Sequence, residues 1–289
     1  MKTDIHQTIT NNIIAQLENG VKPWVCPWKK SSNPFPVNFQ TKANYTGINI
    51  LALYCSAIRN NYMSPYWLTF NQARKAGGHV RRGEKSTLGV FYKNTTVEDN
   101  SGKYENNEKN IPILNSFRVF NLDQIDGIEL PVDEELNENP INFDEDELFN
   151  RAESLVKNIG VPVLYKGDKA FYSQSRDEIT MPEKNRFNNT FDLISTLGHE
   201  AGHSTGAKKR LNREFGKHFG DNAYSLEELV AEYFSCLFNA HLGIEGVHVD
   251  HVSYINDWLE VMRADKTAIF TASKHAYAAY EYITDPQPH

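Results

Sequence analysis

Cysteine is scarce in this chain, which has three in 289 residues. Cys26, Cys55 and Cys236 are odd in number, far apart and without Cys-x-x-Cys spacing, a pattern typical of reduced thiols in a cytosolic protein. The sequence also lacks an apolar run long enough to cross a bilayer, and its start has no apolar segment of the secretory type. We therefore expect a cytoplasmic protein without a membrane partner.

Acidic residues are scarce only at the start of the chain. Residues 1–93 contain three Asp/Glu against twelve Lys/Arg, whereas residues 94–150 contain fifteen against three, within an overall net charge of −7. The basic part suits an anionic partner. Pro131 and Pro140 lie among the acids, so we predict a linker at residues 126–147. It would separate a head, residues 1–125, from a body, residues 148–289.

One stretch of the body, residues 189–206, has the spacing of an amphipathic helix, with Asn189 or Thr190 as its cap and Gly206 beyond its end. His199 and His203 are four positions apart, so both imidazoles leave one helix face and can reach one zinc ion, or a similar divalent transition metal, at about 2.0–2.1 Å. Glu200 completes a His-Glu-x-x-His motif and can accept a proton from water at the site. The simpler alternative is a helix with two surface histidines.

A second helix is predicted to begin at Ser225, with Glu227 and Glu228 in its first turn. A carboxylate there can supply a third metal ligand. This arrangement resembles the Glu-zincin metallopeptidases, whose second helix carries a ligand Glu and, four residues later, an acidic residue bonded to a ligand His. The resemblance implies Glu228 as the ligand, with Glu227 as the alternative, and Glu232 as the partner of His199.

The rest of the body is predicted as a helix at residues 148–159, strands at 161–165, 170–175 and 177–182, and helices at 249–261 and 266–283. We expect the third strand to form the sheet edge that pairs with an extended substrate. The His248-x-Asp250-His251 pattern lacks further partners and is interpreted as surface.

The head is predicted to be a small α+β module. Its helices are expected at residues 3–17, from about 49 to 59, and at 66–76, where Ser64 is the cap. Strands are expected at 88–92 and 116–121, and an acidic, Asn-rich segment of unexplained role, residues 94–115, joins them.

Two features of the head suggest contact with unpaired nucleic acid. Tryptophans in a proline-rich loop either fill a small core or provide stacking surfaces for bases. A basic turn at residues 79–85 can contact phosphates. The alternative is that this turn is a basic surface that binds nothing. The DNA-binding residues that we predict are Trp24, Trp28, Lys29, Lys30, Arg74, Lys75, Arg81, Arg82 and Lys85.

Two blocks of sequence resemble a known family. The head contains Pro23-Trp24, Asn44-Tyr45-Thr46-Gly47-Ile48-Asn49 and Gly77-Gly78-His79-Val80-Arg81-Arg82-Gly83-Glu84, and is similar to the N-terminal domain of ArdC-type antirestriction proteins. The body contains His199-Glu200-Ala201-Gly202-His203 and Glu227-Glu228-Leu229-Val230-Ala231-Glu232, and resembles their zincin-like metallopeptidase domain. The resemblance implies a two-domain α+β protein of mobile elements that binds single-stranded DNA and protects incoming DNA from restriction.

Two hypotheses for function follow. The first is a zinc peptidase delivered by a DNA-binding head, with Glu200 as the base, Tyr224 or His218 stabilising the oxyanion, and an unknown protein as substrate. The second is a protein that shields single-stranded DNA and whose zincin domain is structural or inactive.

Overall fold

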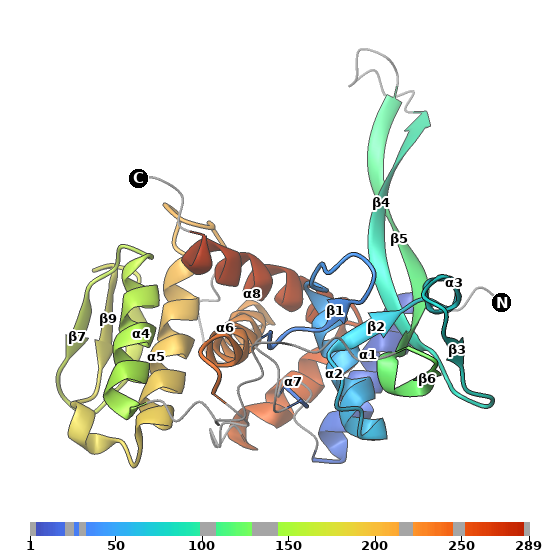
Figure 1. Cartoon of the computed structure of the whole chain (residues 1–289). Helices are drawn as coiled ribbons and strands as arrows, with labels where there is room; N and C mark the ends of the chain where they lie inside the picture. Colours follow the sequence, from blue (N-terminus) through green and yellow to red (C-terminus); the bar gives the residue numbers. More distant parts are fainter. Residues whose placement is uncertain are drawn as a thin grey trace.

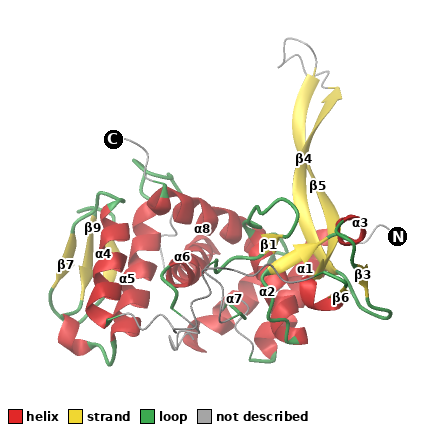
Figure 2. Ribbon diagram, viewed as in Figure 1, coloured by secondary structure: helices red, strands yellow, loops and turns green. Residues whose placement is uncertain are grey.

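The computed structural model describes residues 4–20, 26–28, 33–98, 108–128, 144–213, 222–244 and 252–285. It has the α+β architecture in two domains that the sequence predicts. Figure 2 shows the helices gathered in the middle of the molecule, with strands at its two ends. No helix in the described ranges is long and apolar enough to span a membrane.

Three helices and a 4-stranded sheet form most of the described head (Figure 1). The helices are α1 (Ile5–Glu18), α2 (Ile48–Asn60) and α3 (Phe70–Lys75). The sheet has the order β1-β2-β5-β4 and contains β1 (Val37–Asn38), β2 (Tyr66–Leu68), β4 (Thr87–Glu98) and β5 (Glu108–Asn121). A separate antiparallel pair is formed by β3 (His79–Val80) and β6 (Ile125–Asp126), and the short helix η1 (Leu122–Gln124) leads from β5 into β6. Strand β6 ends one residue past the expected head boundary at residue 125, and Ile128 still packs against a small hydrophobic cluster of the head. Residues 129–143 lie outside the described ranges.

The predicted helix at residues 66–76 is wrong in its first part, because Tyr66–Leu68 is a strand. Trp67 and Leu68 are both fully buried, which requires apolar neighbours on both faces and suits a central strand better than a surface helix. The helix begins instead at Phe70, where Thr69 and Gln72 form a capping box. Phe70 itself is exposed.

The two predicted strands at 88–92 and 116–121 belong to a hairpin that is much longer than expected. β4 and β5 pair from Thr87 opposite Val119 to Glu98 opposite Glu108. β-Branched residues within the supposed polar segment, among them Thr95 and Ile111, continue the pairing. In Figure 1 the hairpin rises away from the rest of the molecule, so most of the acidic, Asn-rich segment is the outer part of this arm.

The body contains the predicted elements with shifts of a few residues at their ends. The helices are α4 (Glu145–Lys157), η2 (Lys184–Arg186), α5 (Thr190–Thr205), α6 (Asn222–His241), α7 (Val252–Ala264) and α8 (Ala268–Thr284). The strands are β7 (Val163–Tyr165), β8 (Phe171–Ser173) and β9 (Glu178–Met181). Because α6 begins at Asn222, Ser225 lies inside the helix and is not its cap. His248, Asp250 and His251 lie outside the described ranges.

The strand expected at the substrate-binding edge of the sheet is in fact its centre. The order is β7-β9-β8, with β9 parallel to β7 and antiparallel to β8. Ile179 and Met181 on β9 are fully buried. β9 therefore has no free edge for a substrate, and that prediction was wrong.

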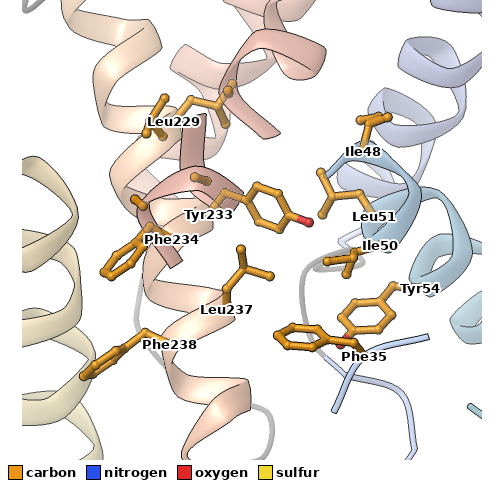
Figure 3. Close-up of a cluster of buried hydrophobic side chains, with 14 of the residues drawn as sticks. Phe35, Ile48, Ile50, Leu51, Tyr54, Leu229, Tyr233, Phe234, Leu237 and Phe238 are labelled. Carbon is orange, nitrogen blue, oxygen red and sulfur yellow. The ribbon is translucent and has the colours of Figure 1, made fainter. Parts of the chain in front are cut away.

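Head and body share one hydrophobic core, which Figure 3 shows where α2 faces α6. Ile50, Leu51 and Tyr54 of α2 lie opposite Tyr233 and Leu237 of α6, and the Tyr233 hydroxyl donates to the carbonyl of Gly47 at 3.2 Å. Helix α1 adds a buried stripe of Ile9, Ile13 and Leu17 that belongs to the same cluster and faces α7. The helix that carries the acidic residues of the predicted site is thus packed directly on the head.

Candidate metal centre

Helix α5 presents the two histidines as the sequence predicts. Asn189 caps the helix, since its side chain accepts from the backbone N–H of Asp192 at 2.8 Å. The Nε2 atoms of His199 and His203 converge to 3.1 Å, and both rings are largely buried. The alternative of two unrelated surface histidines is therefore excluded.

Glu228 brings the third set of ligand atoms from α6. One of its carboxylate oxygens lies 3.4 Å from Nε2 of His199, and the other lies 3.5 Å from Nε2 of His203. Ligand atoms of a tetrahedral site with arms of about 2.0–2.1 Å lie about 3.3–3.4 Å apart. Two imidazoles and a carboxylate at this spacing can hold a divalent ion and leave a fourth position open.

Each histidine has a carboxylate behind it as well. The Nδ1 atom of His199 lies 3.1 Å from Glu232, as the resemblance implied, and Nδ1 of His203 lies 3.2 Å from Glu227. Such partners fix the ring orientation and keep Nε2 available for a metal. Glu227 faces the outer nitrogen of His203, so the geometry favours Glu228 over Glu227 as the ligand.

Arg213 is a member of this cluster that sequence reasoning did not identify as a site residue. Its buried guanidinium donates to both carboxylate oxygens of Glu227, at 2.7 and 2.9 Å, to the carbonyl of Gly202 and to the hydroxyl of Thr205. It ties the end of α5 to α6. A buried arginine needs a carboxylate partner, and Glu227 supplies one. Arg213 and Glu227 are fourteen residues apart across a loop, so no periodic pattern in the sequence predicts their contact.

The carboxylates control the protonation of the imidazoles. Burial acts to lower the pKa of His203, but hydrogen bonds with Glu227 and Glu228 outweigh it and raise this pKa to about 9. Burial likewise acts to raise the pKa of Glu228, yet its hydrogen bonds with His199 and His203 hold that pKa well below its ordinary range. The surroundings favour positive charge at the histidines, which a metal cation would supply in place of protons.

The predicted catalytic residues have different outcomes. Glu200 is 7% exposed and lies near His199. Burial acts to lower the pKa of His199, but Glu232, Glu228 and, to a smaller extent, Glu200 raise that pKa well above its ordinary value. Tyr224 is half-buried in the first turn of α6. His218 lies outside the described ranges.

The predicted DNA-binding residues do not form one surface. Trp28 is only 4% exposed, packs edge-on against Tyr54 and donates to the carbonyl of Asn33, so its assignment to a stacking surface is corrected: it fills the core. Trp24, Lys29 and Lys30 lie outside the described ranges.

The basic turn and α3 are exposed, but one of their arginines has a structural role. The guanidinium of Arg81 pairs with Glu84 at 3.0 Å and Asp126 at 3.4 Å and donates to the carbonyl of Asp123. It therefore braces β6 against the turn. The remaining members are exposed, namely Arg74, Lys75, Arg82 and Lys85.

Comparison with known proteins agrees with this division of the chain. Residues 3–120 match the N-terminal domain of anti-restriction factor ArdC, and residues 150–275 match a zincin-like metallopeptidase family. An uncharacterized protein, y4eC of Sinorhizobium fredii (strain NBRC 101917 / NGR234), is 34% identical over 97% of this chain and 92% of that protein. The DNA primase TraC of Escherichia coli is 32% identical over 98% of this chain, which corresponds to 20% of the primase.

Solved structures give the same result. The metal-free crystal structure of the antirestriction ArdC protein from the R388 plasmid is 31% identical and superposes with a TM-score of 0.78 over 99% of this chain and 100% of that one. The Mn(II)-bound structure of that protein gives a TM-score of 0.79 over 98% of both chains. Since a solved relative above 30% identity is matched along its whole length and both domain models occur in order, the chain belongs to the ArdC-type antirestriction proteins.

Proposed function

We propose that this protein is a metal-dependent peptidase with a head that binds single-stranded DNA, and that it acts in antirestriction. The observation that carries the peptidase half is the convergence of His199, His203 and Glu228, at 3.1 to 3.5 Å, beside the buried Glu200. A helix that needed only packing would not bury two imidazoles and four carboxylates together, because each buried charge requires compensation.

In this proposal each residue has a defined task. His199, His203 and Glu228 hold the ion, while Glu232 and Glu227 orient the imidazoles. When bound, a divalent ion supplies Lewis acidity toward a peptide carbonyl. Glu200 accepts the proton of the attacking water, and Tyr224 is our candidate donor to the oxyanion. We propose Zn²⁺ as the ion because two imidazoles and one carboxylate at tetrahedral spacing suit it.

Metal content tests the ligand set. We expect elemental analysis after dialysis to find about one divalent ion per wild-type chain and far less in His203→Ala. Equal content in the two proteins would remove the site. A competition series with Zn²⁺ and Mn²⁺ determines which ion is held more tightly.

Glu200→Gln separates binding from catalysis, because it removes the proton acceptor and leaves the ligands in place. We expect this variant to retain the metal and to lose proteolysis. Proteomic comparison of cells that express the wild type or Glu200→Gln identifies substrates as proteins with new termini in the wild type alone. The peptidase assignment fails if both strains contain the same cleaved proteins.

The head supports the DNA-binding half of the proposal through its composition and its surface. Residues 1–93 carry nine more positive than negative charges, and large aromatic side chains are exposed at Phe70 and Phe91. Phosphate attraction with base stacking favours single strands and gives little sequence preference. Fluorescence anisotropy with labelled single- and double-stranded oligonucleotides over a salt series tests this. If DNA binding persists in Glu200→Gln and no protein is cleaved by the wild type, the protein is a DNA shield and not a peptidase.

A further inference from the structure

The β4–β5 hairpin has two faces of different character, which its register defines. Gly89 pairs with Phe117, Phe91 with Asn115 and Lys93 with Ile113, so these residues share one face. Tyr92 pairs with Leu114 on the opposite face. Adjacent aromatic residues, Phe91 and Tyr92, thus point to opposite sides of the same strand.

The first face holds a row of three aromatic rings. The Phe117 ring lies over Gly89. A Cβ at this position would overlap the ring, so only glycine leaves room for it. Tyr45 stacks on Phe117 with ring centroids 6.0 Å apart and planes 19° apart, and Phe91 follows at 6.2 Å. Asn38 donates to the Tyr45 hydroxyl at 3.2 Å and orients that ring.

One ring of this row, Phe91, is exposed, whereas Tyr45 and Phe117 are partly buried and pack against the core. Phe91 is 47% exposed, so its ring is open to a ligand. Lys93 follows Phe91 on the same face. In the register of β4 and β5, Lys93 and Lys109 fall on the side of this face, whereas Arg118 and the acidic pair Glu98 and Glu108 fall on the side of the opposite face. The partner of this face is therefore expected to be both flat and anionic.

We propose that the Tyr45–Phe117–Phe91 face of the hairpin is the base-stacking platform for single-stranded DNA. The inference rests on the DNA-binding half of the proposed function and gives it a location. Bases stack on exposed aromatic faces irrespective of sequence, and cations beside them attract the phosphates. Trp28 cannot serve this purpose because it is buried, whereas the hairpin offers rings on an arm that projects from the molecule (Figure 1).

The test compares two neighbouring substitutions in the full-length protein, Phe91→Ala and Tyr92→Ala. Tyr92 is 57% exposed, so it matches Phe91 in size, exposure and strand but lies on the other face. We measure anisotropy of a labelled oligothymidine and expect Phe91→Ala to weaken binding about 5- to 150-fold, the range for loss of one stacked base. Tyr92→Ala should bind like the wild type, and Phe91→Trp should retain or increase affinity.

Each result has a definite meaning. If the wild type binds oligothymidine and Phe91→Ala binds it equally well, the platform is elsewhere on the head while DNA binding itself stands. If the wild type does not bind at low salt, the platform and the DNA-binding function fall together. If Phe91→Ala changes the sedimentation of the free protein and leaves DNA affinity unaltered, the face is an interface between copies of the chain, and the proposal is overturned.

Discussion

Glu227 and Glu228 are neighbours in sequence but have different roles in the structure. One step along a helix turns the side chain by about 100°. Glu228 therefore faces the Nε2 atoms, whereas Glu227 reaches Nδ1 of His203 and is held by Arg213. Glu232 orients His199. In the same way, Glu227, itself held by Arg213, orients His203.

Substitution of Glu227 should weaken metal binding without abolishing it. We expect Glu227→Gln to lower metal affinity about 10- to 100-fold, the usual effect of removing a partner of a ligand histidine. Chelator competition and the absorption spectrum of the Co²⁺-loaded protein measure this. Glu260→Gln, an exposed glutamate on α7, is the control. Loss of metal as complete as in His203→Ala would make Glu227 a ligand, and unchanged affinity would remove its role.

Asp177 should make the protein sensitive to acid. Hydrogen bonds from Arg210 hold the pKa of Asp177 well below its ordinary range, although partial burial opposes this. Its stabilising effect is present above the unfolded-state pKa of about 3.9 and is lost as the pH falls through the folded-state value. Asp177 has a left-handed backbone, φ 50°, which asparagine tolerates, so Asp177→Asn removes charge without backbone strain.

We expect Asp177→Asn to lower Tm by about 2–4 °C at neutral pH, equivalent to about 1 kcal/mol in a chain of this size. The difference from the wild type should shrink as the pH falls below about 3.9. Thermal unfolding from neutral pH to pH ~2 measures it, and Asp168→Asn in the exposed turn before β8 is the control. A difference that is constant with pH would mean that packing, and not charge, is responsible.

Helical spacing alone predicted that His199 and His203 share one helix face, whereas Glu228 and Glu232 were expected from the resemblance to the Glu-zincins. Arg213 was not predicted because it lies in a loop and its partners lie on two helices, α5 and α6. The burial of Trp28 could not be predicted either. A tryptophan in a proline-rich loop has the same sequence pattern whether its ring packs in a core or binds a ligand.

The pairing of α5 with α6 depends on two glycines. A Cβ on Gly202 would lie 2.9 Å from the Phe234 ring and 3.1 Å from Cα of Ala231, and one on Gly198 would lie 2.8 Å from the Phe238 ring. Both glycines precede a metal-site histidine by one position. The close approach of these two helices is what brings Glu228 to the imidazoles.

Gly202→Ala should therefore disturb the metal site as well as stability. Alanine gains about 1 kcal/mol in helix propensity, but overpacking costs about 1–3 kcal/mol, so we expect a net loss of up to about 2 kcal/mol together with weaker metal binding. Gly198→Ala is the matched comparison. Its close neighbours are side-chain atoms of Phe238 and Ser235, which can rotate, whereas Gly202 faces the backbone of Ala231.

Denaturant unfolding and chelator competition on both variants provide the measurements. A Gly202→Ala protein with unchanged stability and metal affinity would show that α6 can shift without moving Glu228.

At the level of elements, the sequence predicted helices better than strands. Helices such as α4 and α8 have an apolar stripe along one side, and this stripe is visible in the sequence. Strand order has no such local signal, so the central position of β9 could not be predicted. The strand at Tyr66–Leu68 was mistaken for a helix because a short apolar run next to a good helix cap fits both.

At the scale of the whole molecule, the two halves should unfold together. Ile13 on α1 is 1% exposed within a core that includes Trp258 of α7 and Tyr233 of α6. We expect Ile13→Ala to cost about 2–5 kcal/mol and to lower the protection of α6 amides as much as that of α2 amides. Hydrogen exchange followed by mass spectrometry measures both. Protection lost in the head alone would mean that the halves unfold independently.

The shared core also limits how such a protein can be inherited. A recombination event that joined the body to a foreign head would remove α1 and α2 and leave Leu229, Tyr233 and Trp258 in water. Exchange of the two halves as a single block avoids this loss. The match with TraC of Escherichia coli has that form, since 98% of this chain corresponds to one fifth of the primase. Its history is therefore expected to be that of one gene segment, copied whole, in which the β4–β5 hairpin and helix α5 change together.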